Sequence, residues 1–269
     1  MNMNILVTLN SNYIKPLKVM LKSMFLNNPD DTFTVYLMHS RLSEREVEDI
    51  RGFAENGGSR LENLQIGDDE FADAPVLLHY SKEMYFRLLA YKTLPETINR
   101  ILYLDPDILV INPISDLYNT DIDHYLYAAA YHDLVPVREI NKIRLYPYKI
   151  EAYHNSGVLL MNLELLRSEA DDKEIYGFIE ENRLKLIMPD QDILNAVYAN
   201  RIKSLDEKLY NYDTRYYNYY KLTSNGEFDM DGIINHTMIL HFCGKRKPWQ
   251  KQYTGKFHSL YKHYEKLAK

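Results

Sequence analysis

The feature that most constrains the fold is a regular alternation of apolar runs with amphipathic segments through the first two hundred residues. The runs are rich in β-branched and aromatic residues and predict buried strands, whereas the segments between them carry apolar residues at helical spacing. This alternation is typical of an α/β protein with a mainly parallel sheet and helices on both faces. The predicted strands are 5–9, 32–38, 61–66, one that begins at 101 and ends at the acids within 105–107, 127–132 and 157–163, and the predicted helices include 14–25, 44–57, 82–94 and 193–199.

No linker rich in proline, glycine or serine divides the 269 residues. We therefore predict one domain over 1–249 and a C-terminal helix within 250–269. The net charge of −6, with no basic stripe in the body of the chain, argues against nucleic-acid binding. A single cysteine, Cys243, favours a reducing compartment. No signal peptide or membrane-spanning stretch is recognisable, so a cytoplasmic location is expected.

Two carboxylates, Asp105 and Asp107, stand one residue apart at the end of the apolar run that opens the segment 101–111, and Pro106 between them lacks the backbone donor that strand pairing needs. Side chains alternate between faces along a strand, so both acids are predicted to point the same way. Like charges this close repel each other unless a cation such as a divalent metal ion lies between them. The alternative is a solvated turn, but the apolar flanks make unpaired acids costly. The end of a strand in an α/β sheet is also where ligands usually bind.

A second polar segment, 241–249, follows the short apolar run 238–240. The imidazole of His241 is a usable metal ligand, and Gly244 permits a tight loop. Three consecutive cations at 245–247 would suit a pyrophosphate. The alternative interpretation is a basic surface turn beside a buried histidine.

Two further clusters are less specific. Pro189-Asp190-Gln191-Asp192 precedes a predicted helix that Asp190 is able to cap, a common use of aspartate. Tyr153-His154-Asn155-Ser156-Gly157 enters an apolar strand and could be a plain turn. No glycine-rich dinucleotide fingerprint or phosphate-binding P-loop motif is present, which argues against those two nucleotide folds.

Together these segments resemble glycosyltransferase family 8, which includes bacterial lipopolysaccharide α-galactosyl- and α-glucosyltransferases and glycogenin. The resemblance runs from residue 5 to about 249. Six motifs occur in order: Asn10-x-Asn12-Tyr13, Tyr85-Phe86-Arg87, Leu104-Asp105-Pro106-Asp107, Asn155-Ser156-Gly157, Asp190-Gln191-Asp192 and His241-x-x-Gly244-x-x-Lys247-Pro248-Trp249. The last is the most specific. The resemblance implies a GT-A type, Rossmann-like α/β fold with a C-terminal helical extension.

The resemblance also implies a role for each matching residue. The ligands of a Mn²⁺ ion would be Asp105, Asp107 and His241, a mixed set that suits Mn²⁺ better than Mg²⁺. The contacts to the nucleotide and its sugar would come from Thr8, Asn10, Asn12, Tyr13, Asp105, Pro106, Asn155, Ser156, Gly244 and Lys247. The catalytic groups around the donor sugar would be Arg87, Asp190 and Gln191, with Asp133 nearby.

Two residues depart from the family pattern. Asn10 stands where many members carry aspartate at the edge of the uracil, although an amide can still accept and donate hydrogen bonds. Pro106 lacks the backbone N–H that relatives direct toward the ribose, which leaves only its carbonyl group.

The function implied by the resemblance is retaining, Mn²⁺-dependent transfer of glucose or galactose from a UDP-sugar to a glycan or lipopolysaccharide-type acceptor. The amide of Gln191 is a poor nucleophile, which favours front-face attack over a covalent intermediate. One alternative is a metal-dependent nucleotidyltransferase, which usually has a glycine-rich basic loop near its N-terminus that this chain lacks. The other is a non-catalytic protein that binds nucleotide sugars.

Two C-terminal segments each allow two interpretations. The tail 245–269 carries eight Lys and Arg residues against one Glu, and its predicted helix could bind an anionic membrane peripherally or cover the sheet. The apolar face of this predicted tail helix consists of Phe257, Leu260, Tyr261, Tyr264 and Leu267.

The segment 210–220 contains six tyrosines, which could stack on acceptor sugars or pack on the domain.

Overall fold

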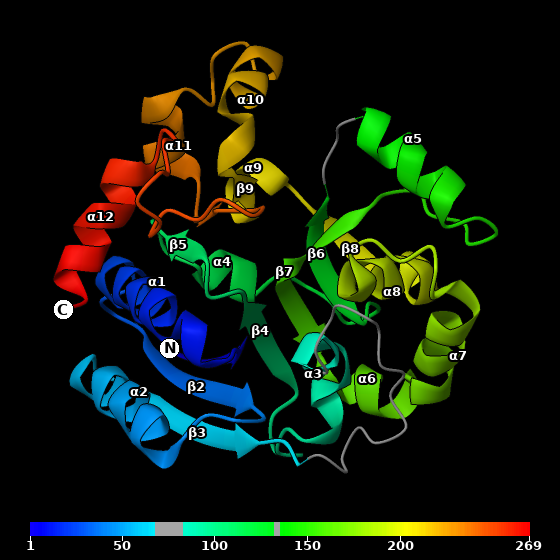
Figure 1. Ribbon diagram of the computed structural model, residues 1–269, viewed down its shortest axis with the longest axis horizontal. Helices are drawn as coiled ribbons and strands as arrows, with labels where there is room; N and C mark the ends of the chain where they lie inside the picture. The colour runs from blue at the N-terminus through cyan, green and yellow to red at the C-terminus, as the bar shows by residue number, and fades with distance from the viewer. Residues whose placement is uncertain (68–82, 132–134) are drawn as a thin grey trace.

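A seven-stranded sheet with the order β3-β2-β1-β4-β7-β6-β8 forms the centre of the computed structural model (Figure 1). The structure describes residues 1–67, 83–131 and 135–269. Three residues named in the sequence predictions, Lys82, His132 and Asp133, lie outside the described residues. The strands of this sheet are β1 (Asn2–Thr8), β2 (Thr32–His39), β3 (Arg60–Gln65), β4 (Arg100–Leu104), β6 (Tyr127–Tyr131), β7 (His154–Asn162) and β8 (Ile202–Leu205).

Parallel pairing dominates the sheet, which confirms the predicted fold class. β1 pairs in parallel with β2 and β4, β2 with β3, and β6 with β8. β7 runs antiparallel to both of its neighbours, β4 and β6. Its first residues therefore lie at the same edge as the carboxyl ends of β1 and β4, where the amide of Asp105 donates to the carbonyl of Gly157 at 2.8 Å.

The apolar segment 101–111 contains two strands, and the acids stand at the end of the first, as predicted. Its first part forms β4, whereas its last part forms β5 (Ile108–Val110) in a separate sheet of order β5-β10-β9, with β9 at Tyr212–Asp213 and β10 at Ile239–His241. Residues 105–107 are the turn between the two sheets. Proline has no N–H to donate to a sheet, so Pro106 fits a place where strand pairing stops.

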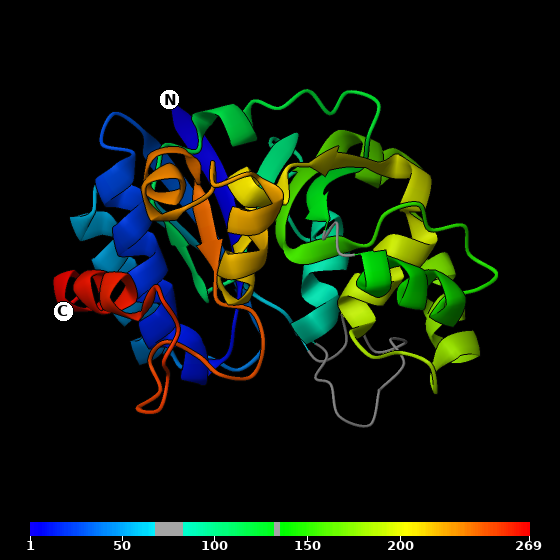
Figure 2. The same ribbon diagram turned by 90° about the horizontal axis from the view of Figure 1, so that it is seen from above.

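Helices cover both faces of the large sheet (Figures 1 and 2). Successive residues of β1 enter different cores: Ile5 packs with α1 and α2, and Leu6 packs with α3, α6, α7 and α8. The helices are α1 (Ile14–Asn27), α2 (Glu44–Asn56), α3 (Glu83–Leu89), α4 (Ser115–Tyr118), α5 (Val135–Arg144), α6 (Leu163–Glu169), α7 (Asp172–Asn182), α8 (Pro189–Val197), α9 (Glu207–Tyr210), α10 (Tyr217–Thr223), α11 (Met230–His236) and α12 (His258–Leu267). Short 3₁₀ turns are η1 (Ser11–Tyr13), η2 (Ala90–Lys92), η3 (Ala199–Arg201) and η4 (Thr214–Tyr216).

The C-terminal elements form a third apolar core with the smaller sheet. Tyr212 and Tyr220 from the tyrosine-rich segment are at most 1% exposed and pack there with Phe257 and Tyr261 of the tail. α12 lies along α1, and the amide of Asn27 donates to the hydroxyl of Tyr264 at 2.8 Å. The burial of these rings accounts for much of the aromatic content of the segment 210–220 and of the tail. Among the described residues, none of the helices has both the length and the apolar character needed to cross a bilayer.

Candidate active site

A pocket of about 440 Å³ opens at the edge of the large sheet where β4 ends and β7 begins. The carboxyl ends of parallel strands are the usual place for a ligand in an α/β protein. Ten of the residues that were predicted to form the site line this pocket: Arg87, Asp105, Asp107, Asn155, Ser156, Asp190, Gln191, His241, Gly244 and Lys247. Elements far apart in the sequence thus contribute to one cavity.

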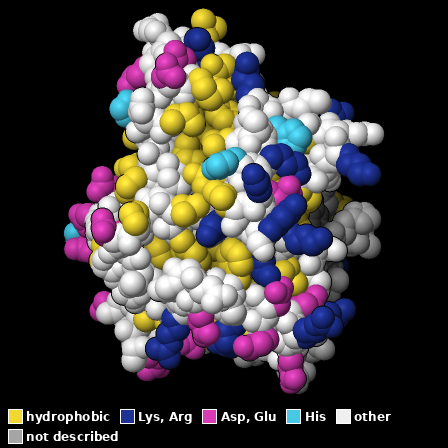
Figure 3. All heavy atoms as spheres, turned by 90° about the vertical axis from the view of Figure 1, so that its left-hand side faces the viewer, with side chains coloured by type: hydrophobic (Ala, Val, Ile, Leu, Met, Phe, Trp, Pro, Cys, Tyr) yellow, Lys and Arg dark blue, Asp and Glu magenta, His cyan; other side chains and the backbone are white. Residues whose placement is uncertain are grey.

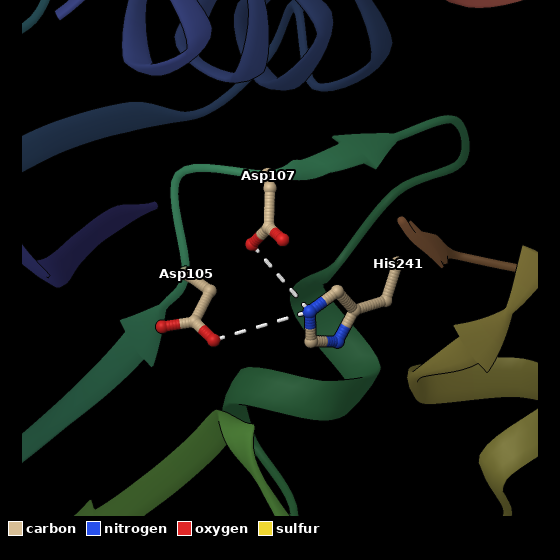
Figure 4. Close-up of side chains that lie close together, drawn as sticks. All are labelled: Asp105, Asp107 and His241. Atoms are coloured by element: carbon tan, nitrogen blue, oxygen red, sulfur yellow. Dashed lines mark ion pairs between the residues drawn. The ribbon is translucent and has the colours of Figure 1, made fainter. Parts of the chain in front are cut away.

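The carboxylates of Asp105 and Asp107 and the imidazole of His241 meet in this pocket (Figure 4). Nε2 of His241 lies 3.5 Å from Oδ1 of Asp107 and 3.9 Å from Oδ2 of Asp105. One ligand atom from each residue falls within 4.8 Å of the others. The predicted convergence of residues 105, 107 and 241 is therefore present, although the turn after β4, rather than the alternation of one strand, brings the acids together.

The surroundings of His241 fit a metal ligand. Its Nδ1 lies 2.8 Å from Oδ1 of Asn211, and an N–H donated there leaves the lone pair of Nε2 facing the two acids. Gly157 leaves room for the ring of His241 beside the carboxylate of Asp105, because a Cβ atom at this position would lie 2.4 Å from Cε1 of His241 and 2.7 Å from Oδ2 of Asp105. Two carboxylates and one supported imidazole form a donor set that suits Mn²⁺ or a similar divalent ion.

Lys247 is the closest cation to this group. Its ammonium donates to Oδ2 of Asp107 and, at 2.9 Å, to the carbonyl oxygen of Phe242. Burial alone would raise the pKa of Asp107, but His241 and Lys247 outweigh it and hold that pKa well below its usual value. Asp107 is therefore ionised at neutral pH, as a metal ligand must be.

Arg87 joins the acidic pair to the opposite wall of the pocket. Its guanidinium lies 3.1 Å from Oδ1 of Asp105 and 3.3 Å from Oδ2 of Asp190. It also stacks over the ring of Tyr103, 4.5 Å from the ring centroid, and the Tyr103 hydroxyl donates to Asp105 at 2.5 Å. Ser156 contributes a further contact, since its backbone carbonyl accepts from Arg87 at 3.0 Å.

The start of α8 supplies two more polar groups. The carboxylate of Asp190 accepts from the hydroxyl of Ser156 at 2.7 Å. Asp190 does not cap α8, so the alternative interpretation of this residue as a helix cap is wrong; it lies inside the first turn, with its carboxylate toward Ser156 and Arg87. Gln191 is 5% exposed, and its Oε1 accepts from Nδ2 of Asn155 at 3.5 Å.

Five of the predicted residues are not among the lining of this pocket: Thr8 at the end of β1, Asn10, Asn12 and Tyr13 just after it, and Pro106 in the turn after β4. The hydroxyl of Thr8 lies 3.2 Å from that of Tyr103, and Asn10 caps η1 by accepting from the amide of Asn12 at 3.0 Å. Tyr13 forms an edge contact with Trp249, with ring centroids 5.8 Å apart. Tyr13 thus stands beside the loop that carries Lys247.

Several pocket residues were not predicted. Asn211 supports His241, and Arg215, Tyr216 and Cys243 line the same pocket. Asp192 belongs to a predicted motif but is fully buried, and it accepts from Arg144 and from the Tyr153 hydroxyl at 2.5 Å instead of entering the cavity. No local pattern distinguishes Asn211 or Arg215 within a tyrosine-rich segment, so only their place in the fold reveals them.

Comparisons with known proteins identify relatives of this chain by sequence and by fold. The chain is 28% identical to the lipopolysaccharide 1,2-glucosyltransferase of Escherichia coli K12, over 93% of this chain and 73% of that protein. It is 22% identical to the lipopolysaccharide 1,3-galactosyltransferase of Salmonella typhimurium LT2, over 91% and 72%. The solved structure of the galactosyltransferase LgtC with donor and acceptor sugar analogues has the same fold, with a TM-score of 0.82 over 98% of this chain and 96% of that one at 23% identity. The model of glycosyl transferase family 8 matches residues 4–253, so the chain is a member of that family and a glycosyltransferase.

Proposed function

We propose that this enzyme transfers glucose or galactose from a UDP-sugar to a saccharide acceptor with retention of anomeric configuration. The observation that carries the proposal is the meeting of Asp105, Asp107 and His241 in one pocket beside Lys247. The names of the two curated relatives, a glucosyltransferase and a galactosyltransferase, support both donor sugars.

The nucleotide would bind after β1, next to the metal ligands. The ring of Tyr13 offers a flat surface for uracil, held upright by its edge contact with Trp249. Because the side-chain oxygen of Asn10 already caps η1, its amide NH₂ is the group left to donate to the base. Thr8, Asn12 and the carbonyl of Pro106 would complete this side of the site.

The diphosphate would lie between the acidic pair and the loop after β10. A bound Mn²⁺ would supply Lewis-acid stabilisation of the charge that develops on the leaving UDP. Lys247 fixes Asp107 and adds positive charge at the same place. The backbone at Gly244 has a φ of 87° and no side chain, which permits close approach of a phosphate oxygen.

The sugar would lie against α8 and the start of β7. Arg87 and Asp190 hold each other in position and offer a fixed acceptor for sugar hydroxyls. Gln191 is the α8 side chain that we place nearest the anomeric carbon, and an amide oxygen is a poor nucleophile. We therefore favour front-face attack, in which the leaving phosphate oxygen takes the proton of the acceptor hydroxyl.

A donor hydrolysis assay tests this function directly. The purified chain with MnCl₂ should release UDP and free hexose from UDP-glucose or UDP-galactose. Release of hexose 1-phosphate, by transfer of the uridylyl group with cleavage of the P–O–P linkage, would instead identify a nucleotidyltransferase, and binding without turnover would identify a nucleotide-sugar-binding protein.

Substitutions in the pocket distinguish the role of the proposed metal ligands from that of Gln191. Asp105→Asn and Asp107→Asn should lower hydrolysis at least about a hundredfold, because a metal contributes several kcal/mol to the transition state. Gln191→Ala should leave measurable turnover, and the exposed Asp116→Asn should match the unmodified chain. Complete and equal loss in Gln191→Ala would favour a covalent route.

We also propose that the acceptor is a glycan, free or linked to lipid, and that α12, in the extension after residue 249, brings the enzyme to an anionic membrane surface. On the face where α12, α1 and α2 lie at the left of Figure 1, hydrophobic side chains form a continuous area with Lys and Arg side chains grouped beside it (Figure 3). Basic residues near an apolar area favour anionic headgroups.

A further inference from the structure

A second cavity, of about 430 Å³, lies directly beside the pocket described above. The two cavities share Arg215, Cys243 and Gly244 in their linings. The other walls of the second cavity come from the loop between β10 and α12 and from the start of α10. A ligand in the second cavity would therefore adjoin whatever occupies the first.

The second cavity is strongly cationic, although the chain as a whole carries a net charge of −6. Lys245, Arg246 and Lys256 line it and are exposed. Among the residues that the structure describes, no carboxylate forms an ion pair with any of the three, and the ammonium of Lys256 lies over the ring of Tyr217, 4.5 Å from its centroid. Unneutralised cations around one cavity repel each other and attract an anion.

Arg215 stands at the boundary between the two cavities. Its Nε and Nη2 donate to the buried carboxylate of Asp213 at 2.9 and 2.6 Å, which fixes the plane of the guanidinium. Nη1 has no acceptor in the described part of the protein. A Cβ atom at Gly244 would lie 2.9 Å from this nitrogen, so glycine at that position keeps Nη1 accessible. A donor with fixed geometry thus faces the passage between the cavities.

Neutral polar groups complete the lining. Asn218 and Thr254 offer hydrogen bonds suited to sugar hydroxyls, and Tyr217 offers an aromatic surface. The volume lies within the range of pockets that hold small ligands. The combination of cations, amide, hydroxyl and ring is appropriate for a sugar that carries a phosphate group.

We propose that this second cavity binds a phosphate group of the acceptor substrate, with Lys245, Arg246 and Lys256 holding the phosphate and Arg215 facing the sugar beside it. The inference rests on the proposed function, because an acceptor must reach the donor sugar from an adjoining site. It adds to that function a substrate class, an anionic acceptor in place of a neutral one.

The test compares a phosphorylated with a neutral probe by calorimetry. Glucose 6-phosphate and glucose are titrated into the full chain with saturating UDP and MnCl₂, so that the diphosphate position is already filled. Glucose 6-phosphate should bind at least about tenfold more tightly than glucose, since hydrogen bonds to charged groups are strong. The triple variant Lys245→Gln, Arg246→Gln, Lys256→Gln should lose this preference, whereas Lys251→Gln, exposed in the same loop, should keep it.

Equal binding of the two sugars, or a preference that survives in the triple variant, would overturn the proposal. Co-sedimentation with phosphatidylglycerol and phosphatidylcholine vesicles identifies the source of the phosphate. Vesicle binding that the triple variant loses points to a lipid phosphate, whereas sugar-phosphate binding without vesicle binding points to a phosphorylated glycan.

Hydrolysis of the UDP-sugar by the same preparations keeps the two proposals distinct. Of the three cations at 245–247 that the sequence associated with a pyrophosphate, only Lys247 lines the donor pocket, whereas Lys245 and Arg246 line the second cavity with Lys256. The triple variant should therefore hydrolyse donor at the rate of the unmodified chain. If the unmodified chain hydrolyses donor but does not prefer the phosphorylated sugar, only the phosphate site is wrong. If it hydrolyses no donor at all, the proposed function fails first, and the phosphate site falls with it.

Discussion

At the scale of single residues, the position of Arg87 depends on several contacts at once. It contacts carboxylates on two sides of the pocket, Asp105 and Asp190, and stacks on Tyr103 beneath. Burial disfavours its charge, but the neighbouring acids outweigh this effect and raise the pKa of Arg87 above its ordinary value. A planar fork with several donors can serve both acids at once, which a single ammonium cannot do.

Arg87→Lys should therefore lower kcat/KM for donor hydrolysis by roughly ten- to a hundredfold, the equivalent of one strong charge-assisted hydrogen bond. The matched control is Arg167→Lys, since Arg167 donates to four backbone carbonyls outside the pocket, those of Tyr91, Leu94, Pro95 and Ile98. The control should lose stability in a thermal melt but retain kcat/KM. Full activity in Arg87→Lys would show that the guanidinium of Arg87 is not needed for catalysis.

A second prediction about a single residue concerns His154 and the pH dependence of the free energy of unfolding. It is 3% exposed and lies between Asn195 and Ser204, and burial lowers its pKa from 6.5 to about 4. The unfolded chain therefore binds a proton between pH 6.5 and 4 that the folded chain does not bind. The free energy of unfolding should fall as pH drops through this window, by about 3 kcal/mol, and level off below it.

Urea titrations at several pH values measure this dependence. His154→Gln should give a flatter dependence between pH 6.5 and 4 than the unmodified chain, and the exposed His263→Gln serves as the control. An unchanged slope in His154→Gln would show that other groups cause the acid sensitivity.

The elements of the fold were largely predictable because their signals are local. The helix predicted over 44–57 is present as α2, which begins with a capping box of Ser43 and Glu46 and ends before Gly57. The partners of the two strands in 101–111 were not predictable, because β4 pairs with β7 and β5 pairs with β10, whose residues lie far along the chain. The break between β4 and β5 places the two acids in a turn and makes the metal site possible.

The C-terminal helix supplies the prediction at the level of elements. Phe257 and Tyr261 are buried, so deletion of α12 would expose core, and charge substitution is the cleaner test of membrane binding. Lys266→Gln with Lys269→Gln should weaken co-sedimentation with phosphatidylglycerol vesicles by roughly thirtyfold, at about 1 kcal/mol for each lysine. Lys149→Gln with Lys185→Gln removes the same charge elsewhere and should have little effect. Equal binding by both double variants would argue against docking through α12.

Across the whole molecule, the site lies where two sheets meet. The acids come from the turn that leaves the large sheet, and His241 comes from the end of β10 in the small one. Five of the six ordered motifs supply residues that line the pocket, whereas Asn10-x-Asn12-Tyr13 does not. They did not predict the support that holds the residues in place: Asn211 behind His241, and Gly157 leaving room for its ring. Those contacts depend on packing between distant segments.

Ligands that join the two sheets should stabilise the entire chain. A ligand that binds only the folded state, at a hundred times its Kd, adds about 2.7 kcal/mol, which corresponds to a rise in Tm of roughly 5 °C or more for a protein of this size. If UDP binds after β1 and a metal ion at His241, as we propose, each should strengthen the binding of the other, and MnCl₂ with UDP should therefore raise Tm by more than either alone. Asp107→Asn should abolish the additional rise, and the exposed Asp116→Asn should retain it. An additional rise that persists in Asp107→Asn would mean that the metal holds the nucleotide elsewhere, and that the meeting of the two sheets has another purpose.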